Sequence, residues 1–460
     1  MRRAAPFPAA RVPRRTRAAT VRQGVLVIVA GCASLLSGCA IYHSKPLPTE
    51  PDLARTPTLT VPASDLGVPR LKPEPLDPAK GLTETNVVTL AVVDNPQLKA
   101  LRLQAGVARA QLLEAGLLPD PQISGGPSKS SFFTGYSVTL AEDIQGLIAR
   151  GAVKGAARAN LEQVNLDILW QEWQVAERAR ELYIDSQSLA ALRAVLDRQR
   201  RLLGKLYQRD EASLKQHEGT VSDVAADFIA WNSAQTEWRA FELRDNQTRH
   251  ALDELLGLTP DVQLRLRGAA SGQLVTPAQY HSALAALAVR RPDLLALQAG
   301  YRSEEERLRE AILAQFPLIN AGVTKARSSE EGIQSIGFNV TLTLPLFNRN
   351  RGPIAVGRAS RAYLHQAYQA SLDETTNQAD EVWKAVVIMR RQLKTLEARL
   401  SGLDRAAAAA KESLGRRTLT LADYARVDSN ALTARAEEIQ LRASLEQAQA
   451  VLAMLLAQPF

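Results

Sequence analysis

Residues 336–344 have the sequence IGFNVTLTL, in which apolar side chains alternate with polar or small ones over all nine positions. A period of two is typical of a β-strand with one apolar and one polar face. The stretch 134–140, TGYSVTL, shows a similar alternation, and weaker strand patterns precede both stretches around Ile123 and Ile319. The sequence therefore predicts four strands, arranged as two hairpins.

Each strand pair belongs to a longer segment that occurs twice in the chain. The matching pieces are NPQLKAL at 95–101 with RPDLLAL at 291–297, PQI at 121–123 with PLI at 317–319, and RG at 150–151 with RG at 351–352. Matches in the same order at a nearly constant offset indicate duplication of a whole module of about 190 residues, which is far longer than a solenoid repeat. We expect a first repeat at 81–270 and a second at 271–460.

The rest of each repeat is expected to be helical, because long stretches around residues 128–259 and 354–458 contain no proline. Apolar residues recur every seven positions in the first of these stretches, at Leu161, Ile168, Val175, Leu182, Leu189, Leu196 and Leu203. A sustained heptad indicates coiled-coil packing. We expect an outgoing helix from about Val153 to His217, with helix-reversing turns near Gly219 and at 415–420. The expected fold class is α+β, with long antiparallel coiled-coil helices and four strands per chain.

The N-terminus has the pattern of an exported lipoprotein. The first 38 positions contain seven Arg and no acidic residue. The arginines lie before an apolar run at 24–36, and LSGC follows at 36–39. The run is too short to span a bilayer comfortably and fits a secretory signal better. LSGC resembles a bacterial lipobox, which implies cleavage before Cys39 and lipidation of that residue. We expect a signal peptide at 1–38 and a lipidated, proline-rich extended tether at 39–80.

Composition argues against several classes of function. The net charge of +8 arises almost entirely from the Arg-rich first 38 residues, so the remainder has no electrostatic reason to bind nucleic acid. The five His do not pair at metal-ligand spacing, and no phosphate-binding glycine loop or nucleophile elbow is present. We expect no enzyme activity, no cofactor and no metal site.

Four strands cannot close a barrel, and unsatisfied strand edges in lipid cost several kcal/mol per backbone group. A lipid-anchored chain with such strands must therefore oligomerise or keep the strands out of the membrane. Three copies would supply twelve strands, an even number within the range of outer-membrane barrels. The alternative is a lipid-anchored periplasmic coiled-coil scaffold without a pore. The duplicated two-faced hairpins favour the pore, since a scaffold has no use for them.

Three segments carry a resemblance to a known family: NPQLKALR at 95–102, AGLLPDPQIS at 115–124 and LPLFNRNRG at 344–352. With the duplicated layout, residues 81–460 resemble the TolC-like outer-membrane efflux proteins, and the lipobox fits the lipidated members. The resemblance implies a homotrimer with a 12-stranded β-barrel in outer-membrane lipid and a helical tunnel in the periplasm. It also implies a periplasmic adaptor (membrane fusion) protein and an inner-membrane RND-type pump as partners.

The substrate class stays open at this point. The segment 344–352 looks most like the heavy-metal branch of the family, whereas other branches export drugs or organic solutes. In either case the resemblance implies passive conduction from the pump to the exterior, with the energy supplied by the pump.

In this family the tip of the second helical hairpin narrows the pore with charged residues. The corresponding segment here includes Arg416, Arg417, Asp423 and Arg426. Asp423 matches the usual acidic position, but Arg417 replaces a usual glycine and Arg426 replaces a usual second acid. The resemblance implies a gate and adaptor-docking tip here, but these departures count against an acidic aperture and leave a mixed Arg/Asp gate as the alternative.

The first hairpin tip matches the family turn at Gly219 and Ser222, with Asp223 as a weaker match. A purely structural interpretation applies to both tips, since such residues also cap helices and interact with the helix dipole.

Overall fold

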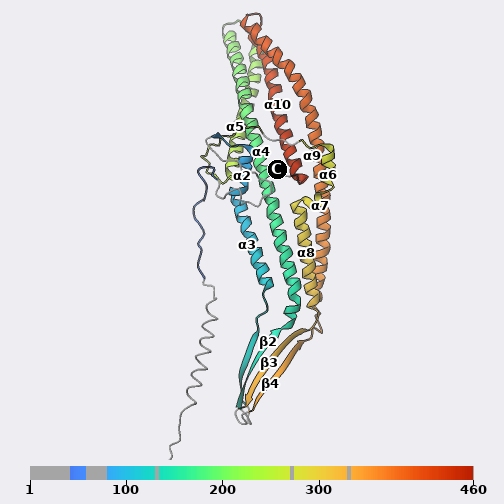
Figure 1. Ribbon diagram of the computed structural model, residues 1–460. Coiled ribbons are helices and arrows are strands. Elements are labelled where there is room, and N and C mark those ends of the chain that lie inside the picture. Colours follow the sequence, from blue (N-terminus) through green and yellow to red (C-terminus); the bar gives the residue numbers. More distant parts are fainter. Residues whose placement is uncertain (1–41, 59–79, 130–133, 270–273, 329–332, 459–460) are drawn as a thin grey trace, which may run out of the picture. The chain divides into compact units, whose positions relative to one another are not determined.

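The computed structural model describes residues 42–58, 80–129, 134–269, 274–328 and 333–458, and the chain divides into two units at residue 52. All helices and strands described here belong to the second unit (Figure 1). The helices are α2 Glu84–Asp94, α3 Pro96–Gly116, α4 Ile144–Lys215, α5 Val221–Leu255, α6 Pro277–Leu284, α7 Leu287–Arg290, α8 Pro292–Leu313, α9 Arg351–Gly415 and α10 Leu421–Leu455. The strands are β1 Gln122–Lys129, β2 Thr134–Asp143, β3 Leu318–Ser328 and β4 Gln334–Thr343. Within these ranges, no helix combines the length and apolar character that crossing a membrane requires.

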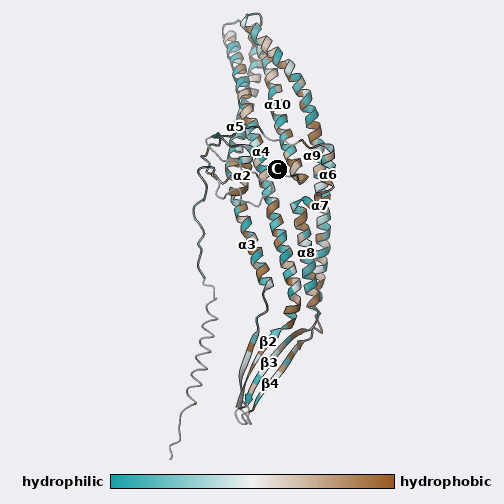
Figure 2. Cartoon of the chain, viewed as in Figure 1, coloured by the Kyte–Doolittle hydropathy of each residue, from teal (hydrophilic) through white to brown (hydrophobic). Residues whose placement is uncertain are grey.

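The four predicted strands form one antiparallel sheet in the order β1-β2-β3-β4. The two expected hairpins are therefore joined, because β2 of the first half pairs with β3 of the second. The register aligns Ile123, Leu140, Val323 and Phe338 in one row across the sheet. All four are exposed, Phe338 at 88%. Hydrophobic and hydrophilic residues intermix along the strands in Figure 2.

The next row along the sheet is polar. It consists of Ser124, Thr139, Thr324 and Gly337. The Thr139 and Thr324 hydroxyl groups are 2.7 Å apart and share a hydrogen bond across the junction of the two halves. Adjacent rows of a pleated sheet point to opposite faces, so the sheet has the one apolar and one polar face that the alternation predicts.

Helix α4 runs unbroken over 72 residues from the end of β2 to the first hairpin tip. The expected start near Val153 is wrong by nine residues, because Gly146 and Gly151 make the segment 144–152 a poor helix from propensity alone. At Gly146 the glycine is required by packing: an added Cβ would lie 2.8 Å from Asp143 Oδ2 and 3.0 Å from Pro119 Cγ. Tertiary context therefore overrides propensity here.

The two halves bind the ends of their return helices in matching ways. Asn95 Nδ2 donates to the Leu255 carbonyl at 3.0 Å, and Arg291 Nη1 donates to the Leu455 carbonyl at 3.3 Å. Asn95 and Arg291 each precede the proline at which an opening helix breaks, between α2 and α3 and between α7 and α8. The break thus places a side chain where it satisfies a free C-terminal carbonyl of the hairpin.

Two hydrophobic clusters lie at corresponding places in the halves. One joins α2, α4 and α5 and includes Val87, Leu182, Tyr183 and Leu252. The other joins α6, α9 and α10 and includes Tyr280, Val386 and Leu452. A smaller cluster formed by Leu189, Leu192 and Phe241 packs against Ala436 and Ile439 of α10. The hairpins therefore contact each other through α4 and α10.

Candidate functional site: the tips of the two helical hairpins

The second hairpin tip is a tight turn between α9 and α10. Arg417 has φ +62°, a left-handed conformation that glycine adopts most readily. Its backbone N–H donates to the Leu414 carbonyl at 3.1 Å, and that of Thr418 donates to the Ser413 carbonyl at 3.0 Å. This pair of bonds is a Schellman motif, which satisfies the last carbonyls of α9.

The first tip has the same geometry, with His217 at the position that corresponds to Arg417. His217 also has φ +62°. The His217 N–H donates to the Leu214 carbonyl at 3.0 Å, and the Glu218 N–H donates to the Ser213 carbonyl at 2.9 Å. The left-handed position belongs to His217 and not to Gly219, whose added Cβ would lie 3.2 Å from the Leu214 nitrogen.

The return helices begin alike as well. Thr220 and Thr420 are the N-cap residues, and each hydroxyl oxygen accepts from the backbone N–H of the aspartate three positions on, at 3.2 Å for Asp223 and 3.1 Å for Asp423. Each hydroxyl in turn donates to the carboxylate of that aspartate. Asp223 and Asp423 therefore lie in the first helical turn, where the dipole favours a negative charge. Ser222 is exposed and is not the cap.

The predicted residues of the second tip lie together on the exposed turn. Arg416 pairs with Glu412 at 2.5 Å, one helical turn earlier. Arg426 pairs with Asp423. Arg417 occupies the left-handed position at which the family resemblance leads one to expect glycine. The tip thus presents three arginines and one aspartate, and two of the arginines are already paired locally.

An ion pair that the sequence reasoning missed joins the two hairpins. Arg198 on α4 binds Asp428 on α10, with 2.7 Å between Nη2 and Oδ1. The hydroxyl of Tyr424 donates to Oδ2 of the same carboxylate at 3.3 Å. The Asp428 side chain is 4% exposed and that of Arg198 is 52% exposed. The carboxylate is therefore enclosed, while the guanidinium reaches it from the solvent side.

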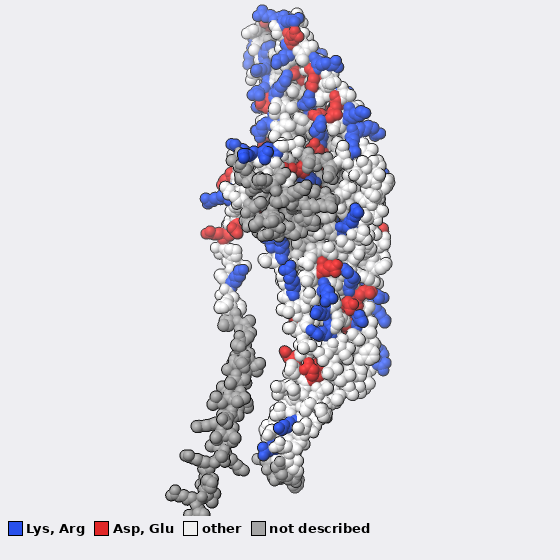
Figure 3. Space-filling view, viewed as in Figure 1, with Lys and Arg blue, Asp and Glu red and all other residues white. Residues whose placement is uncertain are grey.

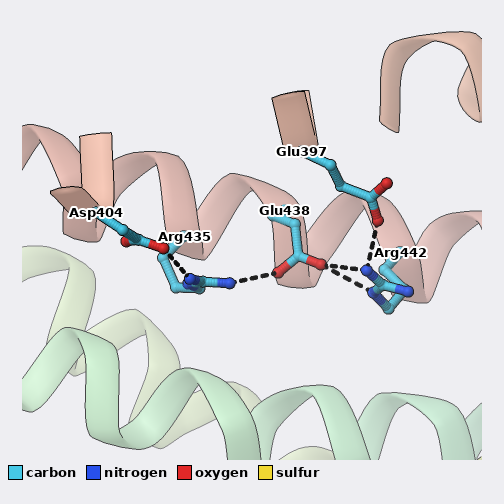
Figure 4. Close-up of polar contacts among 5 residues, drawn as sticks. All are labelled: Glu397, Asp404, Arg435, Glu438 and Arg442. Carbon is cyan, nitrogen blue, oxygen red and sulfur yellow. Dashed lines mark hydrogen bonds and ion pairs between the residues drawn. The ribbon is translucent and has the colours of Figure 1, made fainter. Parts of the chain in front are cut away.

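A second set of ion pairs holds α9 and α10 together (Figure 4). Arg435 binds Asp404 at 2.5 Å, and Arg442 binds Glu397 at 2.7 Å. Glu438 lies between the two arginines, 2.6 Å from Arg442 and 3.7 Å from Arg435. We call this set of five residues the α9–α10 ladder. Its cross-helix pairs are seven residues apart on both helices, as the flanking positions of an antiparallel coiled coil require.

The ladder has a further position toward the tip. Stepping seven residues from Asp404 and from Arg435 leads to Lys411 and Asp428. Lys411 makes no ion pair with any described residue, and Asp428 is bound by Arg198. A cavity of about 490 Å³ between α4, α9 and α10 is lined by Arg198, Asp404, Lys411, Asp428 and Arg435, among others. The sequence signal for this arrangement was the complementary charge at seven-residue spacing on the two helices.

Two buried carboxyls lie far from the tips. Glu177 on α4 and Asp253 on α5 are 6% and 2% exposed, and their carboxylate oxygens have no hydrogen-bond partner among the residues that the structure describes. Burial raises the pKa of Glu177 to about 7 and that of Asp253 to about 6. Both border the cluster between α2, α4 and α5.

Charged side chains are distributed unevenly over the molecule. Figure 3 shows them interspersed along the helical hairpins and sparse over the sheet. No group of three or more His, Cys, Asp or Glu among the described ranges could hold a metal ion. Cys39, the expected lipidation site, lies outside the described residues.

Comparison with known proteins identifies the second half by sequence and the fold by structure. Residues 283–458 match the family described as outer membrane efflux protein. No curated protein matches the chain in sequence.

Solved channels have the same fold. The Campylobacter jejuni CmeC outer membrane channel is 14% identical, with a TM-score of 0.68 over 92% of this chain and 95% of that one. The outer-membrane channel OprN is 13% identical, with a TM-score of 0.67 over 91% and 99%. CusC, for which transmembrane channel formation is described, is 15% identical, with a TM-score of 0.64 over 89% and 99%. The expected family resemblance is confirmed by sequence over residues 283–458, and the expected fold class, helical hairpins with a four-stranded antiparallel sheet, is confirmed.

Proposed function

We propose that this chain is the outer-membrane channel subunit of a tripartite efflux system. The match of residues 283–458 to the outer membrane efflux protein family supports this proposal. Three copies form a tunnel that conducts substrates passively to the exterior. A periplasmic adaptor and an inner-membrane RND-type pump supply the substrate and the energy. The observation that carries this proposal is the sheet, which is two-faced and has two open edges.

Within one chain the sheet leaves the backbone hydrogen-bonding groups along its two edges unpaired. β1 and β4 each have a pairing partner on one side only, so each leaves a row of backbone N–H and C=O groups free. The row containing Phe338 exposes large apolar side chains on one face, whereas the row containing Thr139 is polar. In a closed ring of three sheets the edges would pair, the apolar face would meet lipid and the polar face would line water.

The helices support the same closure. α3 packs on α4, α4 on α8 and α8 on α9, so α3 and α9 have open sides in this layer. Both carry exposed apolar side chains: Leu103 and Val107 on α3 are 75% and 60% exposed, and Val356 and Tyr363 on α9 are 65% and 71% exposed. Head-to-tail packing of α3 against α9 of the next copy would bury both surfaces.

Membrane attachment follows from the N-terminus. We place the signal peptide at 1–38 and a lipid anchor on Cys39, with the tether at 39–80 and the two repeats at 81–270 and 271–460. Part of the tether contacts the body: the Ala54 N–H donates to the Gly257 carbonyl at 2.9 Å, and the Thr259 N–H donates to the Ala54 carbonyl at 2.9 Å. These two bonds hold the tether at Ala54 against the end of the first hairpin.

The tips are the proposed gate and adaptor-docking surface. Arg416, Arg417, Asp423 and Arg426 would narrow the tunnel at the second tip, with Gly219, Ser222 and Asp223 beside them on the first. Substrate passes without strong binding and is a drug-like organic solute or a heavy-metal cation. Selection between the two classes is left to the pump.

The test is single-channel conductance of the purified mature protein in planar bilayers, beside Asp423→Ala and Arg417→Ala. A small conductance that rises in either variant supports a tunnel gated at the second tip. A conductance unchanged in both keeps the channel and moves the gate elsewhere. Absence of conductance in all three, from material that is monomeric in detergent, would favour the pore-less coiled-coil scaffold.

A further inference from the structure

Asp428 is a buried carboxylate that depends on a cation from another helix. Its side chain is 4% exposed, and its only ion-pair partner among the described residues is Arg198 of α4. Asp428 itself lies on α10. Any movement that separates the second hairpin from α4 therefore removes the partner and leaves a buried charge unpaired, which is strongly unfavourable.

Lys411 is a further cation at this cavity. It is on α9, it lines the same 490 Å³ cavity as Asp428 and Arg198, and it has no ion pair of its own in the described part of the chain. The heptad step that matches Asp404 with Arg435 also matches Lys411 with Asp428. The lining also includes the small side chains of Ala407, Ala408 and Ala431, and the lysine side chain is flexible.

We propose that Lys411 is a reserve partner for Asp428. In the observed arrangement Asp428 binds Arg198 and ties α10 to α4. When α10 moves away from α4, the carboxylate transfers to Lys411, which completes the α9–α10 ladder and lets the second hairpin move as one paired unit. The exchange makes separation of the hairpins reversible, because the carboxylate has a cation in both arrangements. Its consequence for opening rests on the proposed function, but the exchange itself does not.

Thiol accessibility tests the exchange without relying on conductance. Ala431→Cys places a small thiol at a position that is 5% exposed and lines the cavity. Its rate of reaction with a maleimide in the intact lipid-anchored protein reports how often α10 separates from α4. Circular dichroism of each variant confirms that it is folded.

Lys411→Met in this background should slow labelling about tenfold, because the separated arrangement loses its only cation for Asp428. Lys411→Arg should restore the parent rate. Lys394→Met is the matched control, since Lys394 is another exposed α9 lysine without an ion pair in the described ranges, and it should leave the rate unchanged. Arg198→Met should raise the rate.

The decisive comparison uses Asp428→Asn. With the carboxylate neutralised, Lys411→Met should no longer change the labelling rate. An equal effect of Lys411→Met with and without Asp428, or no effect beyond that of Lys394→Met, would overturn the proposal. Because labelling requires no current, loss of conductance in every variant would refute the channel while leaving this result intact.

Discussion

The two helical hairpins have the same turn geometry but different side chains along their seams. Near its tip the first hairpin packs aromatic rings: Tyr207 of α4 stacks on Trp231 of α5 with centroids 5.2 Å apart and planes 6° apart, and Phe228 lies 5.6 Å from Tyr207. The second hairpin uses the α9–α10 ladder. The cap bonds of a tight turn admit few solutions, so they are alike in the two halves. Farther from its tip the first hairpin also has α4–α5 ion pairs, Arg193 with Asp245 and Arg244 with Asp185, so the seams differ in the aromatic packing near the first tip.

Trp231→Ala should produce the largest loss of stability. The indole packs against Gly204, where an added Cβ would lie 3.1 Å from Trp231 Nε1, so its removal leaves a hole that α4 cannot fill. We expect the local opening free energy of the first hairpin to fall by about 3 kcal/mol, at the low end for such truncations because the ring is half-buried. Hydrogen exchange of amides in α4 and α5 measures it. The loss should be the same at low and high salt, and a loss that disappears at high salt would contradict the aromatic explanation.

Glu177→Gln should change how the stability of the first half depends on pH. The pKa of Glu177 is raised by burial, so its contribution to stability is complete below about pH 4.5 and is lost as the pH rises through about 7. The neutral glutamine avoids this loss, so the variant should be more stable than the parent at pH 8, on the order of 1–3 kcal/mol, and equal to it at pH 4.5. Exchange rates of α4 amides against pH measure the difference. A parent that becomes more stable toward pH 8 would show the sign to be wrong.

Glu438→Gln should weaken the second hairpin and make its salt dependence visible. Glu438 is buried between two partly exposed arginines, so we expect a loss of about 1–2 kcal/mol at low salt that shrinks as salt screens the ladder. Amide exchange in α9 and α10 measures it. Glu412→Gln is the control, because its pair with Arg416 is exposed at both ends and should contribute almost nothing. Equal effects of the two substitutions would mean that the ladder has no special role.

The smallest expected change in stability comes from placing glycine at the left-handed position of each tip, and it should be the same in both hairpins. His217→Gly and Arg417→Gly each relieve a left-handed backbone, and we expect a gain of about 0.5–1 kcal/mol per tip after the greater freedom of glycine in the unfolded chain is counted. Amide exchange at the two tips measures it. Gln216→Gly, at a C-cap with negative φ, should be neutral or unfavourable. A gain at only one tip would show that the two turns are not equivalent.

The parts of this fold with strict periodicity could be predicted from the sequence. Alternation located all four strands, and the absence of proline together with the heptads located the hairpins. The pairing of β2 with β3 could not be predicted, because it joins strands almost two hundred residues apart and no local pattern specifies a partner. The start of α4 was misplaced because a glycine that packing requires looks like a helix breaker.

At the tips, too, some features could be predicted from the sequence and others could not. Arg417 was identified as standing where glycine is usual, but its left-handed backbone becomes evident only in the turn. The pair of Arg198 with Asp428 is a contact between helices that are remote in sequence, and a charge pattern on one helix cannot reveal which of two cations will bind it.

The unbroken length of α4 has a consequence for the order in which the chain can fold. During synthesis α4 emerges after α2 and α3, and α5 can cover part of it soon afterwards. Its remaining faces pack against α8 and α10, which are made roughly one hundred to two hundred and fifty residues later. Contacts this remote in sequence form slowly. A nascent chain therefore carries a long helix with uncovered apolar stripes until α10 has been made, and such exposed surface favours aggregation during that interval.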